Sequence, residues 1–497
     1  MRFLFYVGSV LLWLGVGVYV LAFTSIGNSF VKPKVEAKIN EQLHIDAKLS
    51  KFEIRFDRFN IILNLDANNK VELDGTYSLF SQTLDVNYNV ELDKLETLKT
   101  LTKADLRGVF HTSGNVKGDM AYIKVDGKSD LASSITNYMV EVKNLKPDNA
   151  KLTIKDMQLA QVLYMVEQPH YTDGKFSLDA TITNLKLNNL KGEITSYIKD
   201  GLLDSAYLSK TYEFKSKMPK TTYNLKTYTT LDGTMVDTNI KLNSTLAKLE
   251  IKSAKFNIAD SSIISDYKTT IKSFNKLFFV TQRKMRGGIT INGELKKAKD
   301  LDLSIYTNIA GGKIDAKLHN DEFKANLKSV QTLKMLHILI YPEIFKASLN
   351  AKVDYNLKSQ KGNFSGHLVK GTFIKNEMIT LVKKYARVDL YREIFSGDVD
   401  AKINKEKILA SLDLKSRQAS IVTKNTKLDT KKQTIDSKVS MQIKKNHINV
   451  TLKGKIDSPK IGLDAKAIIK DKIKDRLTKE IEKKAGKEVK NILKSFF

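Results

Sequence analysis

The sequence contains no cysteine, one tryptophan and only six prolines in 497 residues. Without cysteine the chain can form neither disulfides nor thiolate metal sites nor a cysteine nucleophile, although this absence does not identify the compartment. So few prolines argue against long proline-rich linkers. Acidic residues are also scarce, with 55 against 83 lysines and arginines and a formal net charge of +28. The lysines are spread along the whole chain, which is typical of solvated strand faces and would also suit an anionic partner surface.

Catalytic and cofactor-binding motifs are missing as well. The seven histidines are scattered and show no H-E-x-x-H or other paired metal spacing. Neither a P-loop, nor G-x-S-x-G, nor a nucleotide-binding fingerprint occurs. The aromatic residues fall in the apolar phase of the predicted strands, away from the lysines, whereas nucleic-acid binding needs both kinds on one surface. We therefore expect a non-enzymatic protein with no cofactor, no metal and no nucleic-acid partner.

The chain has one long apolar run, from Phe3 to Phe23, and the next charged residue after Arg2 is Lys32. As a helix of about 21 residues it would rise about 31 Å, the thickness of the hydrocarbon core of a bilayer, so we assign residues 1–31 to a transmembrane anchor. A cleaved signal peptide is the alternative, but the run is long for one and no A-x-A site follows it. The lysines at 32, 34 and 38 would keep the following domain in the cytoplasm. That rule weakens before a large domain, so local charge does not settle the side.

Downstream of the anchor the hydrophobic period is first helical and then becomes two. Pro33 opens a short amphipathic helix that we place at residues 32–45. Beyond it, apolar residues alternate with polar ones in short runs, which predicts half-buried strands. The pattern continues over residues 46–360, with helical interruptions, and over residues 361–464. The sequence therefore predicts a mainly β protein, a serial antiparallel sheet with one apolar face and few short helices.

The apolar positions of these strands are the candidate site residues, because they would share one face of the sheet. They are Phe52, Ile54, Phe56, Phe176, Leu178, Ile182, Leu301, Leu303, Ile305, Leu349, Val353, Tyr355, Leu412, Leu414, Val439, Met441, Ile443, Ile448, Val450 and Leu452. Glycine-containing pairs such as Asp74-Gly75 and Asn292-Gly293 are predicted to be turns between the strands.

Two internal helices are predicted at residues 156–166 and 330–339, where apolar residues recur with a helical period. They mark a possible internal repeat. Setting Pro169 against Pro342, a shift of 173 residues, aligns the apolar positions of the two helices and of the strands that follow them. Because a helix, a proline and an alternating strand are a common sequence of elements, coincidence remains an alternative.

Further helices are predicted at residues 377–385, 388–395 and 465–497. The last is amphipathic, with an apolar residue at nearly every fourth position and lysines on the other face. It either caps the open edge of the sheet or contacts a membrane interface or a partner, and the sequence favours neither.

The predicted apolar face raises a problem of size. About 25 strands, spaced about 4.8 Å apart, would form a sheet roughly 120 Å long. A bare apolar face of that size is not tolerable in water. The sheet must therefore fold on itself as a sandwich or solenoid, or curl into a long groove that holds an apolar ligand. Periodicity alone does not separate the two arrangements.

The order of these segments resembles AsmA-like proteins, a family related in design to TamB and to the chorein-type bridge proteins. The segments that carry the resemblance are VKPKVEAKINEQLHIDAKLSKFEIRF after the anchor, MRGGITINGELKKAKDLDLSIYTNIAGGKIDAKL, LKMLHILIYPEIFKASLNAKVDYNLKSQKGNFSGHLVKGTFIKNEMITLVKKYARVDLYREIFSGDVDAKI, and the ending VTLKGKIDSPKIGLDAKAIIKDKIKDRL. The likeness covers the layout of the whole chain and is most specific from about residue 289 to 477. It consists of turns and apolar phase, not of catalytic residues.

The resemblance implies a single-pass inner-membrane protein of a Gram-negative bacterium, with a cytoplasmic N-terminus and the bulk of the chain in the periplasm. A long curved sheet would form a hydrophobic groove that carries phospholipid acyl chains toward the outer membrane and supports envelope integrity. Residues 361–464 would correspond to the C-terminal AsmA-like β region. The expected partners are membrane phospholipids and an outer-membrane or envelope protein, because a chain of this length would not cross the periplasm alone.

Two other functions remain open from the sequence. The first is an assembly or scaffold factor that pairs its strand edges with outer-membrane proteins. The second is a membrane-anchored β protein that binds a polyanion such as an acidic glycan, for which the net positive charge would suffice.

Overall fold

The computed structural model describes residues 23–341, 343–375, 379–380, 383, 388–444, 446–456 and 459–464. Residues 1–22 of the predicted anchor and the predicted terminal helix at 465–497 lie outside this part of the chain. Within it, no helix is both long and apolar enough to cross a membrane.

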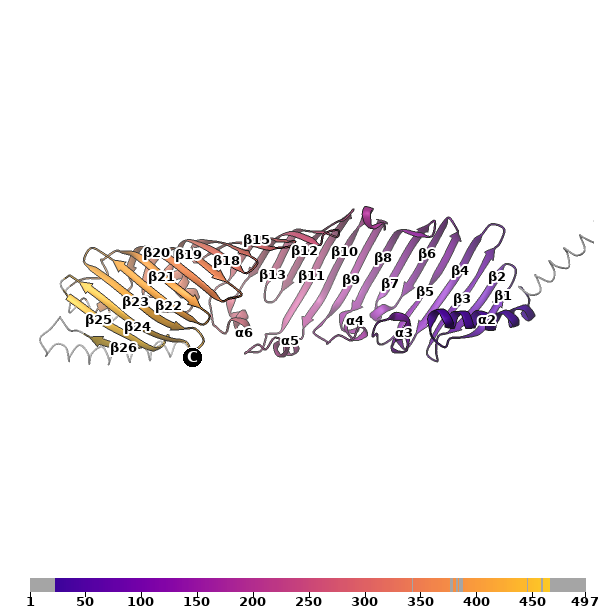
Figure 1. Cartoon of the computed structure of the whole chain (residues 1–497), viewed down its shortest axis with the longest axis horizontal. Coiled ribbons are helices and arrows are strands. Elements are labelled where there is room, and N and C mark those ends of the chain that lie inside the picture. Colours follow the sequence, from indigo (N-terminus) through magenta and orange to yellow (C-terminus); the bar gives the residue numbers. More distant parts are fainter. Residues whose placement is uncertain are drawn as a thin grey trace, which may run out of the picture. The chain divides into compact units, whose positions relative to one another are not determined.

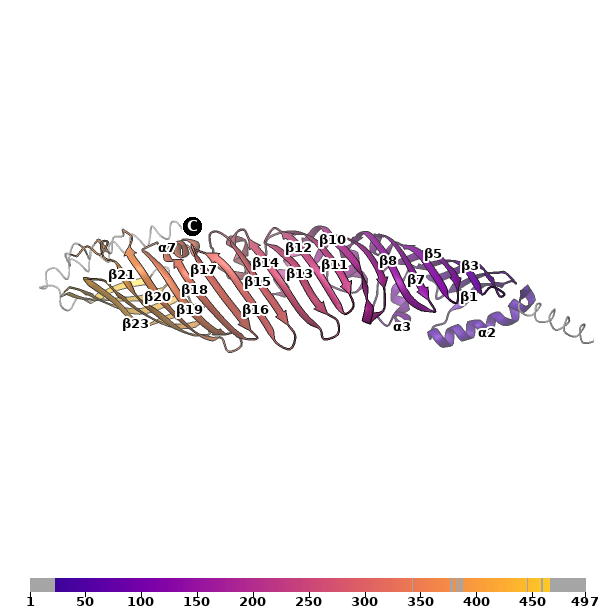
Figure 2. The ribbon, with the colours of Figure 1, turned by 90° about the horizontal axis from the view of Figure 1, so that it is seen from above.

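The described residues are mainly open antiparallel β-sheet with few short helices, which confirms the fold class predicted from the alternation (Figures 1 and 2). They divide into two compact units, one ending at Ser261 and the other beginning at Ser262.

The sheet of the first unit is a meander in which each strand is antiparallel to the next one in the chain. Its strands are β1 (Lys48–Ile54), β2 (Arg58–Asn64), β3 (Asn69–Ser78), β4 (Thr83–Leu92), β5 (Phe110–Asp119), β6 (Tyr122–Ser129), β7 (Ile135–Lys143), β8 (Lys146–Gln158), β9 (Thr172–Asn184), β10 (Lys191–Leu203), β11 (Thr221–Asp232), β12 (Met235–Ser244) and β13 (Lys248–Asn257).

The second unit repeats this arrangement with its own strands, again paired in chain order. They are β14 (Ser262–Ile271), β15 (Ile289–Lys297), β16 (Leu301–Ile309), β17 (Gly312–His319), β18 (Glu322–Gln331), β19 (Phe345–Asn356), β20 (Lys361–Phe373), β21 (Phe395–Asn404), β22 (Lys407–Lys415), β23 (Ala419–Asp429), β24 (Thr434–Ile443), β25 (Asn446–Lys455) and β26 (Pro459–Asp464).

The short α-helices between strands all follow an even-numbered strand in the described part of the chain. In the first unit they are α3 (Lys99–Thr102), α4 (Leu159–Met165) and α5 (Ser205–Thr211), and in the second α6 (Phe278–Thr281) and α7 (Thr332–Ile338). Short 3-10 turns are η1 (Leu95–Leu98), η2 (Leu131–Ser133), η3 (Leu187–Asn189) and η4 (Phe274–Leu277). Connections that follow even-numbered strands of a meander all lie on the same side of the sheet, where those strands end. The helices of the first unit therefore gather along this row of strand ends (Figure 1).

The internal repeat is confirmed by matching backbone features at the predicted shift of 173 residues. Helices α4 and α7 follow Gln158 and Gln331, whose ψ angles are 113° and 115°. Two residues before each glutamine the backbone has a positive φ, 53° at Asp156 and 54° at Ser329. In each copy a side chain 21 residues further on accepts a hydrogen bond from that residue's N–H, at 3.0 Å and 2.9 Å. Helix α4 is therefore shorter than predicted, because Asp156 lies in a bulge of strand β8.

Helix α2 (Ser25–Leu43) begins well before Pro33, which corrects the predicted start. Thr24 caps the helix by accepting a hydrogen bond from the N–H of Gly27 at 3.4 Å. In the next turn the side chain of Asn28 hydrogen-bonds to Ile54 of strand β1, so the helix is attached to the sheet before it reaches Pro33, which lies in its interior.

Three further predictions from local pattern are wrong. Residues 388–395 do not form a helix, because Leu390 and Phe395 are fully buried and hold this segment against a core, with strand β21 starting at Phe395. Gly75 and Gly293 lie inside strands β3 and β15 instead of in turns. Phe56 lies in the turn between β1 and β2, not in a strand. Most of the predicted helix at 377–385 lies outside the described residues.

Candidate functional site

The first unit carries an uncharged strip on one face of its sheet, made of three adjacent rows of the strand register. From β3 to β13 the rows are Val71-Val90-Thr112-Ser129-Thr136-Ile154-Leu178-Ser196-Thr227-Ile240-Ile251, Leu73-Tyr88-Gly114-Gly127-Tyr138-Leu152-Ala180-Ile194-Thr229-Thr238-Ala254, and Gly75-Val86-Val116-Val125-Val140-Ala150-Ile182-Gly192-Leu231-Val236-Phe256. None of these side chains is charged. With about 4.8 Å between strands and about 6.8 Å between rows, the strip covers about 48 Å by 14 Å, or about 670 Å².

No second layer closes over this strip. In strands β2–β13 as described, every apolar side chain of the strip is only half-buried, and none is fully buried. A sheet face in a soluble domain is normally covered by a second layer of helix or sheet. An uncharged and mainly apolar surface that no second layer covers is a candidate binding site.

Hydroxyl groups interrupt the aliphatic rows on strands β4–β7. The hydroxyls of Tyr88 and Tyr138 lie 2.6 Å apart, and that of Tyr138 lies 2.6 Å from Oγ1 of Thr112. Thr112 in turn donates to the carbonyl oxygen of Lys128 at 2.9 Å. Burial, followed by the hydrogen bond to Tyr138, raises the pKa of Tyr88 above its ordinary value. These groups therefore stay neutral and satisfy one another, so the strip gains polar atoms without a charge.

The tyrosine rings lie close to the neighbouring strands because glycines stand opposite them. Tyr88 pairs with Gly114 and Tyr138 with Gly127 across neighbouring strands. A Cβ atom added to Gly127 would lie 2.3 Å from the Tyr88 hydroxyl and 2.4 Å from Cζ of Tyr138. The second unit repeats the arrangement, since a Cβ at Gly293 would lie 2.6 Å from Cζ of its partner Tyr267. Sequence reasoning missed these glycines, although a glycine inside an alternating strand signals a close approach of this kind.

The predicted candidates of the first unit share one face. Leu178 and Ile182 belong to the strip, and Phe176 lies next to it on β9. Phe52 and Ile54 continue the strip onto β1 through the register with β2 and β3, and Phe52 is buried there. Phe56 is 45% exposed in its turn and lies outside the strip.

In the second unit the candidates on β16 and β19 also share a face. Two rows run across four strands: Leu303-Leu318-Phe323-Tyr355 and Ile305-Ala316-Ala325-Val353. The candidate side chains in these rows are half-buried, as is the neighbouring Leu301.

The remaining candidates of the second unit belong to a closed hydrophobic core. Leu414, Met441, Ile443, Ile448 and Val450 are buried, and Leu349, Leu412, Val439 and Leu452 pack against them. The segment that holds Val388 and Leu390 contributes to the same cluster, together with Phe395. The second unit therefore has half-buried apolar rows on strands β16–β19 and a covered core near its last strands.

Helix α2 closes the free edge of strand β1. The Asn28 side chain donates to the Ile54 carbonyl oxygen at 2.9 Å and accepts from its N–H at 3.2 Å. Glu36 accepts from the N–H of Leu49 at 2.8 Å, and Asn40 forms a similar two-way pair with Ala47. These side chains take the place of a further strand, so this edge is closed to strand addition.

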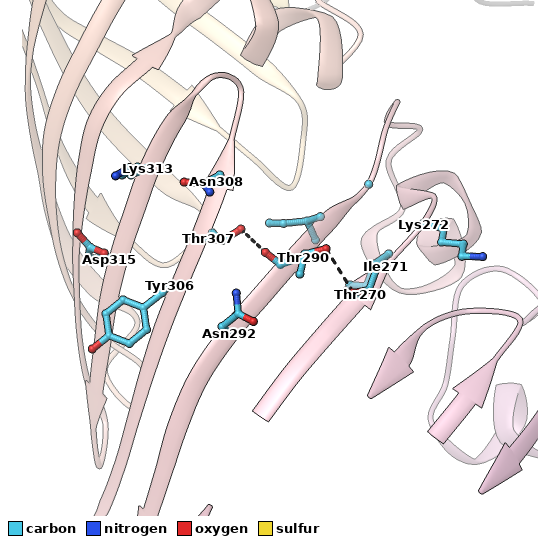
Figure 3. Close-up of a pocket in the computed structure, with 12 residues that line it drawn as sticks. Thr270, Ile271, Lys272, Thr290, Asn292, Tyr306, Thr307, Asn308, Lys313 and Asp315 are labelled. Carbon is cyan, nitrogen blue, oxygen red and sulfur yellow. Dashed lines mark hydrogen bonds between the residues drawn. The ribbon is translucent and has the colours of Figure 1, made fainter. Parts of the chain in front are cut away.

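A polar pocket lies elsewhere, on strands β14–β17. It is an open hollow of about 620 Å³ lined mainly by polar side chains, including Asn292, Tyr306 and Asp315 (Figure 3). Asn292 and Tyr306 are paired in the register and alternate with the apolar residues of their strands, so they lie on the face opposite the half-buried rows. The pocket could hold a small polar molecule.

Titratable side chains cluster at one edge of the first unit. His111 lies between two carboxylates, 2.8 Å from Asp93 and 2.7 Å from Asp130, and these hydrogen bonds raise its pKa. Among the described residues no group of three or more His, Asp or Glu side chains is placed to hold a metal ion. We therefore interpret this cluster as a histidine paired with two carboxylates at the start of strand β5.

No protein-family model matches the chain, and no curated protein is significantly similar to it.

Proposed function

We propose that this chain binds phospholipid acyl chains along the uncharged strip, as a membrane-anchored periplasmic protein that supports lipid transport between the inner and outer membranes. The observation that carries the proposal is the strip itself, an uncharged surface of about 670 Å² that no second layer covers. The AsmA-like order of the segments points to the same function and supplies the envelope location.

The size of the strip suits acyl chains. One leaflet of a bilayer has a hydrocarbon depth of about 15 Å, half of the core, so a strip of about 48 Å could hold about three chain lengths end to end. Burying about 300 Å² of apolar surface contributes about 7 kcal/mol, from which the cost of association is subtracted. Binding of that strength is reversible, as transport requires.

The chemistry of the strip also favours lipid over other apolar ligands. Its only polar groups in the register rows are hydroxyls that are already hydrogen-bonded or lie beside one another, as Ser196 and Thr227 do at 2.8 Å. Such a surface has no directional anchor for one ligand, so chains of different length could slide along it. A scaffold that works by strand addition is less well supported, because α2 occupies the edge of β1.

Photo-crosslinking tests the proposal in the full chain inside a Gram-negative host. A benzophenone amino acid replaces Phe176, which is half-buried beside the strip, or Tyr228, which is 41% exposed on the opposite face. Both positions are aromatic, so the two variants are matched in size. We expect phospholipid adducts, identified by mass spectrometry, at position 176 and not at 228. Equal labelling at both positions, or no lipid at 176, would contradict the proposal.

A further inference from the structure

The first unit exposes large apolar side chains at its amino-terminal corner. They are Ile26 and Phe30 on helix α2, Phe56 in the β1–β2 turn, and Leu79 and Phe80 in the β3–β4 turn, and we call them the apolar corner. Their exposed fractions run from 45% for Phe56 to 89% for Phe80. The turns that follow β1 and β3 lie at the same row of strand ends, because both strands run in the same direction. The exposed side chains of the two turns therefore lie near one another.

The corner is held together by ring contacts and by the backbone. The ring centroid of Phe56 lies 5.7 Å from that of Phe23 and 6.3 Å from that of Phe80. Tyr77 ties the two turns together, because its hydroxyl donates to the carbonyl oxygen of Arg55 at 2.6 Å and its N–H donates to that of Asp57 at 2.9 Å. The apolar side chains are thus presented on ordered turns.

The chain itself indicates what faces this corner. The long apolar run that begins at Phe3 ends at Phe23, the residue whose ring packs against the corner. Along α2, the exposed stripe that begins with Ile26 and Phe30 continues with Lys34 and Lys38, so it passes from apolar to basic away from the run. This order matches a helix that leaves the acyl region of a bilayer and enters the headgroup layer.

We propose that the apolar corner docks into the surface of a phospholipid bilayer, with the two turns inserted beside the anchor and Arg55 and Arg58 at headgroup level. Docking would place the N-terminal end of the strip against the membrane. The inference rests on the proposed anchoring but not on lipid binding by the strip, so the two can fail separately.

The absence of cysteine makes a direct test possible in the full chain. Phe80→Cys and Phe30→Cys each carry an environment-sensitive NBD fluorophore, and both positions are exposed enough to tolerate it. The matched control is Leu145→Cys, an apolar residue that is 61% exposed in the β7–β8 turn on the same edge. The protein is reconstituted into phosphatidylcholine and phosphatidylglycerol vesicles, with or without lipid that is spin-labelled near the headgroup end of the acyl chain.

We expect blue-shifted emission and strong quenching for labels at positions 80 and 30, and water-like emission at position 145. Unquenched labels at 80 and 30 in vesicle-bound protein would overturn the docking proposal. Quenching at all three positions would also overturn it, because the whole edge would then lie along the bilayer. A chain that does not stay with the vesicles removes the anchoring on which the inference rests, while crosslinking at position 176 still reports on the strip.

Discussion

Val125→Asp should block acyl-chain binding at its part of the strip while leaving the fold intact. Val125 lies on strand β6 in the row Val86-Val116-Val125-Val140, which is an outer row of the uncharged strip. Its side chain is half-buried, so an aspartate there could turn its carboxylate to water, and we expect the free energy of unfolding to fall by only about 1–2 kcal/mol.

The effect on the bound state should be larger. An acyl chain over position 125 would lose the apolar contact of a valine, about 1.5 kcal/mol, and would also have to desolvate a carboxylate, which costs several kcal/mol. A loss of at least about 3 kcal/mol corresponds to more than a hundredfold rise in dissociation constant.

The assay is a titration with a dansyl-labelled fatty acid, using a chain that begins at Phe23, with circular dichroism and thermal melting to verify folding. Asn137→Asp is the matched control, because it places the same charge on the next strand but on the exposed opposite face. If a folded Val125→Asp protein bound the same number of fatty acids with unchanged affinity, the assignment of the strip would be refuted, as it would by an equal loss in the control.

Three further predictions concern stability. Gly127→Ala should lower the free energy of unfolding by about 2–4 kcal/mol in urea, because the new Cβ would lie 2.4 Å from Cζ of Tyr138 and displace its hydrogen-bonded ring; unchanged stability would show that the ring moves freely. Asn28→Ala should cost about 2 kcal/mol and promote self-association, seen by light scattering, because the two hydrogen bonds to Ile54 are lost and the strand edge opens. His111 has a raised pKa in the folded state, so its contribution is complete below about pH 6.5 and is lost as pH rises through the folded pKa. His111→Asn should remove that slope from the melting temperature, and an unchanged slope would argue against the ion pair.

Much of the fold is predictable from alternation because a strand with one buried face repeats every second residue. Leu303 and Ile305 on β16 illustrate this. They are two residues apart in the sequence, and the register places both on the face that carries Leu318 and Ala316. The repeat is also predictable from periodicity, because the short helices α4 and α7 break the alternation at equivalent places, directly after strands β8 and β18.

The features that sequence reasoning missed depend on contacts between distant residues. Gly293 resembles a turn glycine locally, and only the Tyr267 ring on the neighbouring strand shows why it lies inside β15. Likewise, the phase of Val450 matches that of an open-face residue, yet it is 1% exposed because other segments close over it. Periodicity reports which face a side chain takes, but not what covers that face.

The strict order of strand pairing has a consequence for cooperativity. In both units each described strand pairs with its neighbours in sequence, so most contacts are local and the entropy cost of closing each loop is small. A linear repeat protein has the same property. A defect introduced in β6 should therefore raise hydrogen exchange mainly in β5, β6 and β7, and fade over the next strands. Such a sheet can open at one point to admit or release a ligand while the rest of it remains folded.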